Sequence, residues 1–291
     1  MRGCLPAWSR IVVSSSLQEI VCLLGQPVEG NPTQFMMERV FAQLGLDWRY
    51  LTLETAAVDL ADALRGVRAL GFRGCNLSAP HLLAAAGLVD AKNPAAELCG
   101  AVNVITRDDR GLRGDNTVGQ GFIESLRTMA DPAGKRVVIL GAGATARAIA
   151  AELVMAGAAH LTVVDRQLGR AEEVRALLRD KLQHEADAVA WHGDFTVPPD
   201  TDLLVHATSA HQHDLDLRLP IKWPAGARLV VADTGYNPVE PRLLREAKDR
   251  GYPTLAGLQM FVNQSALALK LWSDIEPDRA FMRDAVEEFF G

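Results

Sequence analysis

Short apolar runs and stretches with apolar residues at helical spacing alternate along most of the chain. The runs predict buried strands, and the helical spacing predicts helices packed on them. Predicted strands cover 20–24, 48–53, 72–77, 101–106, 137–140, 160–165, the surroundings of Val189, 203–206 and 228–233. Predicted helices cover 34–46, 58–70, a short stretch after Pro80, 119–129, 146–151, 169–184, 241–250, 259–272 and 278–290, and 108–114 is predicted to be a hairpin-like turn. This alternation predicts an α/β protein with mainly parallel sheets.

Length and composition place the chain among globular proteins of about two domains. It has 291 residues, of which 48% are hydrophobic and 23% charged. The net charge of −6 argues against binding to nucleic acid or to anionic membrane surfaces. No apolar run approaches a membrane span, and residues 1–16 are expected to be a leader without function.

The four cysteines are scattered and show no spacing typical of a metal site. They are Cys4, Cys22, Cys75 and Cys99. We therefore expect reduced thiols, a cytoplasmic protein and no metal.

The segment 136–148 (RVVILGAGATARA) has the parts of a dinucleotide site in their usual order. An apolar strand is followed by a turn of small residues, Gly141 to Ala144, and then by an alanine-rich helix. The helix would point its unpaired N–H groups at a pyrophosphate. The strand 160–165 ends in Asp165, where a carboxylate normally holds the adenosine ribose. The alternative is a strand–turn–helix without a ligand. A second α/β unit beginning near Lys135 would leave a cleft between two lobes, with this turn on one wall.

Several separate stretches make the chain resemble the shikimate dehydrogenase family, with its quinate-using relatives. They are Gly25-Gln26-Pro27, Asn76-Leu77-Ser78-Ala79-Pro80, Gly100-Ala101-Val102-Asn103, Gly114-Asp115-Asn116-Thr117, the Gly141 turn, Asp165-Arg166, Ala207-Thr208-Ser209, Asp233 with Tyr236-Asn237-Pro238, and Gly257-Leu258-Gln259-Met260 with Gln264. The resemblance implies an N-terminal substrate-binding domain over 18–118, a doubly wound Rossmann domain over 119–260, and C-terminal helices over 261–291 that pack back on the first domain. It also implies hydride transfer between NAD(P) and a small molecule, in a monomer or homodimer.

The resemblance assigns two groups of binding residues. Substrate-binding positions fall on Asn31, Thr33, Asn76, Ser78, Asn103, Tyr236 and Gln264. Cofactor-binding positions fall on Gly141, Ala142, Gly143, Ala144, Thr145, Ala146, Asp165, Arg166, Ala207, Thr208, Ser209, Gly257 and Met260. The acid at Asp165 favours NAD, because a carboxylate accepts from a ribose hydroxyl and repels a 2′-phosphate. Arg166 favours NADP, which therefore stays open.

The chain departs from the family at the proton-transfer dyad. The place of the catalytic lysine is taken by Leu82, and that of its partner aspartate by Val118. Joint replacement is understandable, since either charge alone would be uncompensated in a buried site. An acid–base group contributes roughly 10²–10⁴ in rate. The sequence thus predicts little ordinary shikimate dehydrogenase activity.

Other groups could have taken over proton transfer. The tentative choice is His81, beside the lost lysine, against the simpler interpretation of a surface or helix-start residue. Asp115, Tyr236 and the pair His211 and His213 are further candidates.

Three functions remain open at this stage. The first is an oxidoreductase acting on a small polyhydroxylated or carbonyl substrate other than shikimate. The others are a non-catalytic protein that binds dinucleotide or a metabolite, and non-redox chemistry in the same cleft.

Overall fold

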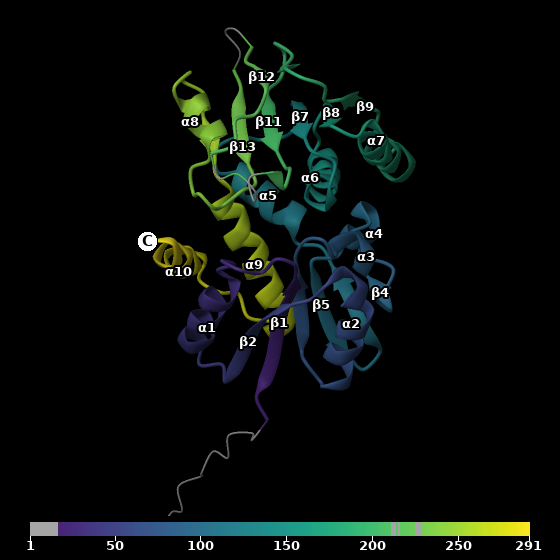
Figure 1. Ribbon diagram of the computed structural model, residues 1–291, viewed down its shortest axis with the longest axis vertical. Helices are drawn as coiled ribbons and strands as arrows, with labels where there is room; N and C mark the ends of the chain where they lie inside the picture. Colours follow the sequence, from purple (N-terminus) through teal and green to yellow (C-terminus); the bar gives the residue numbers. More distant parts are fainter. Residues whose placement is uncertain (1–16, 211–213, 215, 225–227) are drawn as a thin grey trace, which may run out of the picture.

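The computed structural model describes residues 17–210, 214, 216–224 and 228–291, which form two α/β lobes (Figure 1). The predicted leader lies outside the described residues, as do His211 and His213.

The N-terminal lobe is a six-stranded mixed sheet in the order β2-β1-β3-β5-β6-β4. Its strands are β1 (Glu19–Gly25), β2 (Trp48–Glu54), β3 (Gly74–Leu77), β4 (Ala91–Lys92), β5 (Val104–Asp108) and β6 (Gly111–Asp115). β1 pairs in parallel with β2 and β3, whereas β5 is antiparallel to β3 and β6. Its helices are α1 (Thr33–Leu44), the 3-10 turn η1 (Ala57–Asp59), α2 (Leu60–Ala69), α3 (Leu82–Ala85) and α4 (Pro94–Cys99).

Both faces of this sheet are buried, which explains the continuous apolar run in β1. Val21 and Leu23 pack with α1 and the C-terminal helices, while Cys22 and Leu24 pack with α2 on the other face. Cys22, Cys75 and Cys99 are buried free thiols.

The hairpin-like turn predicted over 108–114 is wrong in extent. Residues 111–115 form β6, and only the tip between β5 and β6 turns, with Gly111 at φ 131°. The segment is mostly polar and so lacks the apolar pattern of a strand, but Leu112 is 5% exposed and belongs to the core.

The second lobe has the doubly wound Rossmann topology. Its strands are β7 (Arg136–Leu140), β8 (His160–Asp165), β9 (Ala186–Ala190), β11 (Leu203–His206), β13 (Val230–Asp233) and β14 (Thr254–Leu255), in the order β14-β13-β11-β7-β8-β9. All its pairs are parallel. The strand order reverses at β7, so β7 and β11 flank the switch point at which such sheets bind ligands. A two-stranded sheet of β10 (Phe195–Thr196) and β12 (Ile221–Lys222) lies beside it.

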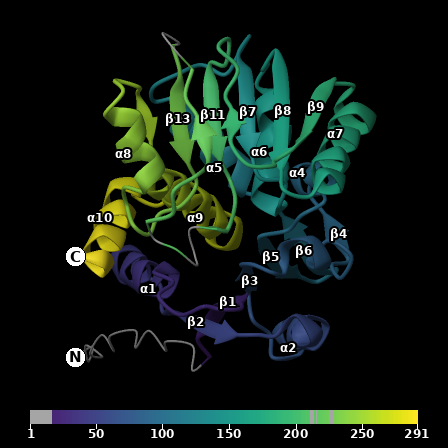
Figure 2. The same ribbon diagram turned by 45° about the horizontal axis from the view of Figure 1, so that its top comes forward.

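Helices cover both faces of the Rossmann sheet (Figure 2). They are α5 (Val118–Leu126), α6 (Ala144–Met155), α7 (Leu168–Leu182) and α8 (Arg242–Lys248). In β7, Val137 and Ile139 pack on the α6 side, while Val138 and Leu140 pack on the α8 side.

The C-terminal helices α9 (Gly257–Ser273) and α10 (Arg279–Phe290) tie the lobes together (Figure 1). Near the end of α9, the Trp272 indole N–H donates to the Ile105 carbonyl at 3.0 Å, inside the N-terminal lobe. Helix α10 packs on α1, where the rings of Phe35 and Phe289 lie 5.6 Å apart. Within the described part of the chain, no helix is long and apolar enough to cross a membrane.

Candidate active site

The turn after β7 is shaped for close approach by a ligand. Gly141 has φ +112°, and a Cβ there would lie 2.7 Å from the Ala207 carbonyl oxygen. A Cβ on Gly143 would meet no atom within 4 Å. Gly143 is the N-cap of α6 and provides no side-chain cap, so the first N–H groups of that helix have no partner from the cap residue. These features fit a dinucleotide pyrophosphate. Ala144, Thr145 and Ala146 form the first turn of the helix.

Asp165 ends β8 beside this turn. Its Oδ2 accepts from the Ala142 N–H at 3.0 Å, and its Oδ1 accepts from the Gln167 N–H at 2.9 Å. A carboxylate has about four acceptor positions, so two remain for ribose hydroxyls. Arg166 is exposed, and its side chain has no hydrogen bond or ion pair with another described residue.

The remaining predicted cofactor positions fall into two segments near the turn. After β11, Ala207 is buried, Thr208 half-buried and Ser209 exposed, and the Thr208 methyl lies 3.1 Å from where a Gly141 Cβ would stand. At the start of α9, a Cβ on Gly257 would lie 2.4 Å from the Gly235 carbonyl oxygen. Gly257 therefore serves chain packing. Met260 is 5% exposed in the apolar core.

Two predicted substrate residues lie at the end of β3. Asn76 is half-buried, accepts from the Tyr50 hydroxyl at 2.8 Å and donates to the Asn103 carbonyl at 3.3 Å. The Ser78 hydroxyl is buried and has no hydrogen-bond partner. A buried hydroxyl without a partner costs about 1–3 kcal/mol, so this oxygen is available to a ligand.

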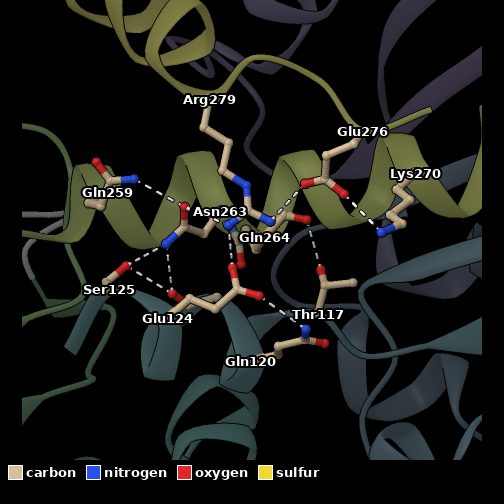
Figure 3. A network of polar contacts seen from close by, with 11 residues as sticks. Thr117, Gln120, Glu124, Ser125, Gln259, Asn263, Gln264, Lys270, Glu276 and Arg279 are labelled. Atoms are coloured by element: carbon tan, nitrogen blue, oxygen red, sulfur yellow. Dashed lines mark hydrogen bonds and ion pairs between the residues drawn. The ribbon is translucent and has the colours of Figure 1, made fainter. Parts of the chain in front are cut away.

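Asn103, Thr117 and Gln264 form a chain across the lobes. The Asn103 amide donates to the Thr117 hydroxyl at 3.0 Å and accepts from the Thr117 N–H at 2.8 Å. The Thr117 hydroxyl donates to the Gln264 carbonyl oxygen at 3.0 Å (Figure 3). Asn103 thus uses one donor and one acceptor to hold the residue before α5.

The network in Figure 3 continues between α5 and α9. The Asn263 amide donates to the Ser125 hydroxyl at 3.0 Å, and Arg279 pairs with Glu124 at 2.6 Å. The Asn263 contact joins α9, which carries Gln264, to α5, and the Arg279 pair joins α10 to α5.

The other predicted substrate residues have different environments. Asn31 Oδ1 accepts from the N–H of Thr33 at 3.0 Å and from its hydroxyl at 2.6 Å, so the pair forms the turn into α1. Tyr236 packs against Phe261 with ring centroids 4.5 Å apart. Burial raises the pKa of Tyr236 to about 12, so its phenol stays protonated at neutral pH and can donate a hydrogen bond.

The two dyad positions lie in one apolar cluster. Leu82 is 8% exposed and Val118 4%, and they share this cluster with Cys99, Ala101 and Phe122. Leu82 begins α3 and Val118 begins α5. Both residues therefore stand at helix starts in apolar surroundings.

The tentative acid–base residue His81 is buried at 1% exposure, which excludes a surface position. Its Nε2 lies 2.9 Å from the Thr55 carbonyl oxygen. Because a carbonyl only accepts, Nε2 carries the proton and holds α3 to that loop. The contact supports a structural role. Asp115 is likewise engaged, by Arg113 at 3.1 Å; burial raises the pKa of Asp115, and Arg113 opposes that rise.

A buried polar array that sequence reasoning missed lies at the carboxyl ends of β11 and β13. His206 Nδ1 lies 2.9 Å from Asp233 Oδ2, and His206 Nε2 lies 2.6 Å from the Thr208 hydroxyl. The side chains of His206 and Asp233 are both 2% exposed. The signal available in the sequence was a titratable residue ending each of two strands.

Two surface hollows lie away from these residues. One of about 530 Å³ is lined by Lys135, Asp202, Arg228 and Tyr252, at the amino ends of the Rossmann strands. The other is a charged surface on α8. Neither is lined by a predicted site residue. In the described residues, no group of three or more acidic, histidine or cysteine side chains could hold a metal ion.

A doubly wound sheet with an open phosphate turn at its switch point, joined to a second α/β lobe that carries an amide-rich site, defines a two-lobed dinucleotide-dependent oxidoreductase. Comparison with known proteins narrows this class. Residues 23–105 match the shikimate dehydrogenase substrate binding domain, 125–216 match shikimate / quinate 5-dehydrogenase, and 257–287 match the shikimate 5′-dehydrogenase C-terminal domain. The chain belongs to the shikimate dehydrogenase family.

Three relatives illustrate the range of this family. The shikimate dehydrogenase (NADP(+)) of Methanopyrus kandleri is 37% identical over 92% of this chain and 95% of its own length. The ligand-free 5-ketofructose reductase of Gluconobacter sp. strain CHM43 is 41% identical, with a TM-score of 0.86 over 94% of this chain and all of that one. A shikimate dehydrogenase in complex with NADP+ is 29% identical, with a TM-score of 0.85 over 93% of this chain and 95% of that one.

Proposed function

We propose that this protein is an NAD(P)-dependent oxidoreductase of a small polyhydroxylated carbonyl compound or alcohol, with little or no ordinary shikimate dehydrogenase activity. The observation that carries the proposal is the pair Leu82 and Val118. Both occupy the places of the family's dyad and are buried in one apolar cluster. A polar group or water that replaced the dyad there would need partners that this cluster does not offer.

The substrate side of the proposal rests on the polar groups that remain. Asn76 and the unpartnered Ser78 hydroxyl lie at the end of the same strand and can bind hydroxyl or carbonyl oxygens. Tyr236 supplies a protonated phenol. A 5-ketofructose reductase is among the relatives, and its substrate is a polyhydroxylated ketone of the size that such groups would bind.

For the cofactor, we propose a preference for NAD. Asp165 places a carboxylate where the adenosine ribose is expected, and that carboxylate is held by two backbone N–H groups. A 2′-phosphate would meet this charge at close range. Arg166 is exposed and would offset part of the repulsion. When bound, the dinucleotide supplies or accepts the hydride.

The test is a substrate panel with both cofactors. Binding of NADH and NADPH is first measured by fluorescence titration. Initial rates are then measured for the reduction of 5-ketofructose by NADH or NADPH, and for the oxidation of shikimate and quinate by NAD+ or NADP+. The proposal expects saturable dinucleotide binding, turnover of 5-ketofructose and negligible turnover of shikimate. Tight dinucleotide binding with no turnover of any compound would instead indicate a non-catalytic binding protein. Turnover without added cofactor would indicate non-redox chemistry.

A further inference from the structure

The array Asp233–His206–Thr208 occupies the place in the Rossmann lobe where a reacting group would be expected. His206 ends β11, and its register partner on β13 is Asp233. Thr208 follows β11 by two residues and lies against the Gly141 turn that follows β7. β7 and β11 flank the switch point of the sheet. Thr208 therefore stands at the edge where the dinucleotide is expected, with its methyl group toward the Gly141 turn and its hydroxyl toward His206.

The orientation of the array follows from its acceptors. An ionised carboxylate only accepts, so the His206 Nδ1–H donates to Asp233 Oδ2 at 2.9 Å. The other carboxylate oxygen, Asp233 Oδ1, accepts from the Gly235 N–H at 2.8 Å. His206 Nε2 then faces the Thr208 hydroxyl at 2.6 Å, and it can accept or donate a proton there.

Two strand ends can pack together without a buried carboxylate, imidazole and hydroxyl bonded in a row. Burying a carboxylate costs several kcal/mol in desolvation, and such a buried group is weak evidence for stability. An acid holding an imidazole, which in turn holds a hydroxyl, is the arrangement that moves protons through a hydroxyl in unrelated enzymes. Thr208 itself is half-buried, whereas His206 and Asp233 are 2% exposed. Of the three residues, only Thr208 is partly exposed, and its hydroxyl also accepts from the Ala210 N–H at 3.3 Å.

We propose that Thr208, His206 and Asp233 form the proton relay that takes the place of the missing dyad; this rests on the proposed function. In the direction of reduction, a hydride from NAD(P)H forms the new C–H bond at the substrate carbonyl carbon. The carbonyl oxygen takes the Thr208 hydroxyl proton as the Thr208 oxygen takes a proton from His206 Nε2. The step therefore starts with a proton on both ring nitrogens of His206 and ends with neutral imidazole, whose Nδ1–H still donates to Asp233. One hydride and one proton thus convert the ketone to an alcohol. Thr208 is the catalytic residue, and His206 acts through it.

The matched pair Thr208→Val and Thr208→Ser tests this relay, because the first removes the hydroxyl at nearly constant shape and the second keeps it. With 5-ketofructose and NADH or NADPH at saturating concentration, we expect Thr208→Val to lower kcat roughly 10²–10⁴-fold. Thr208→Ser should keep kcat within about tenfold. Equal kcat in the wild type and Thr208→Val would overturn the relay.

A second readout needs no turnover. The imidazole ¹⁵N signals of His206, assigned with His206→Gln, report the partner of each ring nitrogen. We expect Thr208→Val to move the Nε2 signal and leave the Nδ1 signal in place, while Thr208→Ser leaves both unchanged. An Nε2 signal unchanged in Thr208→Val would contradict the proposed geometry. Failure of the wild type to turn over any compound of the panel would overturn the proposed function and the relay together. Turnover that survives Thr208→Val would overturn the relay alone.

Discussion

Substitutions at two glycines of the phosphate turn, Gly141 and Gly143, distinguish the role of this turn in the fold from its role in binding. Gly141 has φ +112°, where a side chain is strained, and its Cβ would lie 2.7 Å from the Ala207 carbonyl oxygen. Gly143 has φ −76°, and its Cβ would meet no protein atom within 4 Å. Gly141→Ala should therefore damage the fold, whereas Gly143→Ala should affect only what approaches from outside.

The magnitudes follow from these geometries. An unfavourable φ costs of order 1–3 kcal/mol, and the backbone clash adds to it, so Gly141→Ala should lower the Tm by roughly 2–10 °C. Gly143→Ala should leave the Tm unchanged or slightly raised, because it removes chain entropy from the unfolded state. Its methyl group would push the pyrophosphate away from the α6 N–H groups. Losing one charge-assisted hydrogen bond of about 1.5–3 kcal/mol weakens dinucleotide binding roughly 10- to 100-fold.

The assay pairs thermal unfolding with a fluorescence titration of NADH and NADPH. The reasoning is refuted if Gly143→Ala binds both dinucleotides as tightly as the wild type, because the turn would then not be the phosphate site. A Gly141→Ala variant as stable as the wild type would contradict the steric argument.

Three further predictions address the cofactor, the core and the buried phenol. Asp165→Asn removes the charge and keeps an acceptor, so the ratio of NADPH to NADH affinity should rise by about tenfold in titrations; an unchanged ratio would mean that Asp165 does not set the preference. Trp272→Phe removes the indole N–H that donates to the Ile105 carbonyl and part of a buried side chain, so urea unfolding should show a loss of about 1–3 kcal/mol, and a loss near zero would contradict this. The pKa of Tyr236 is about 12 in the folded state and about 10 when unfolded. The stability linked to this phenol is complete below pH 10 and is lost as the pH rises to 12, by up to ~3 kcal/mol. Between pH 9 and 11.5, Tyr236→Phe should therefore lose less stability than the wild type. Equal losses would contradict the raised pKa of Tyr236.

Much of the fold could be predicted because its strands are buried on both faces. Continuous apolar runs such as 137–140 and 160–165 carry a strong local signal, and the structure has strands at both places. A strand over 101–106 and a hairpin-like turn after it were predicted, but strand β6 was missed because polar residues and glycines surround its core residue Leu112. Helix α4 was also missed, although Asn93 caps it and Pro94 begins it, which is a readable helix start.

The site was predictable where it follows from local pattern and less so where distant segments meet. The turn at Gly141 and the acid at Asp165 lie on one strand–turn–helix–strand unit, and their contact follows from it. His81 was predicted as the acid–base residue, against a surface or helix-start position; it is the N-cap residue of α3, and its buried ring contacts the Thr55 carbonyl, 26 residues away in sequence. The pair His206 and Asp233 depends on the register of β11 with β13, which no local pattern reveals.

The central claim is that the loss of the dyad removed ordinary shikimate chemistry from an otherwise competent family fold. The most direct measurement is the initial rate of NADH and NADPH formation from shikimate, for the wild type and for a Leu82→Lys/Val118→Asp double variant. The account predicts a wild-type rate near background and a gain in the double variant of roughly 10²-fold or more, because the restored charges would compensate each other in the apolar cluster. Rapid oxidation of shikimate by the wild type would contradict it.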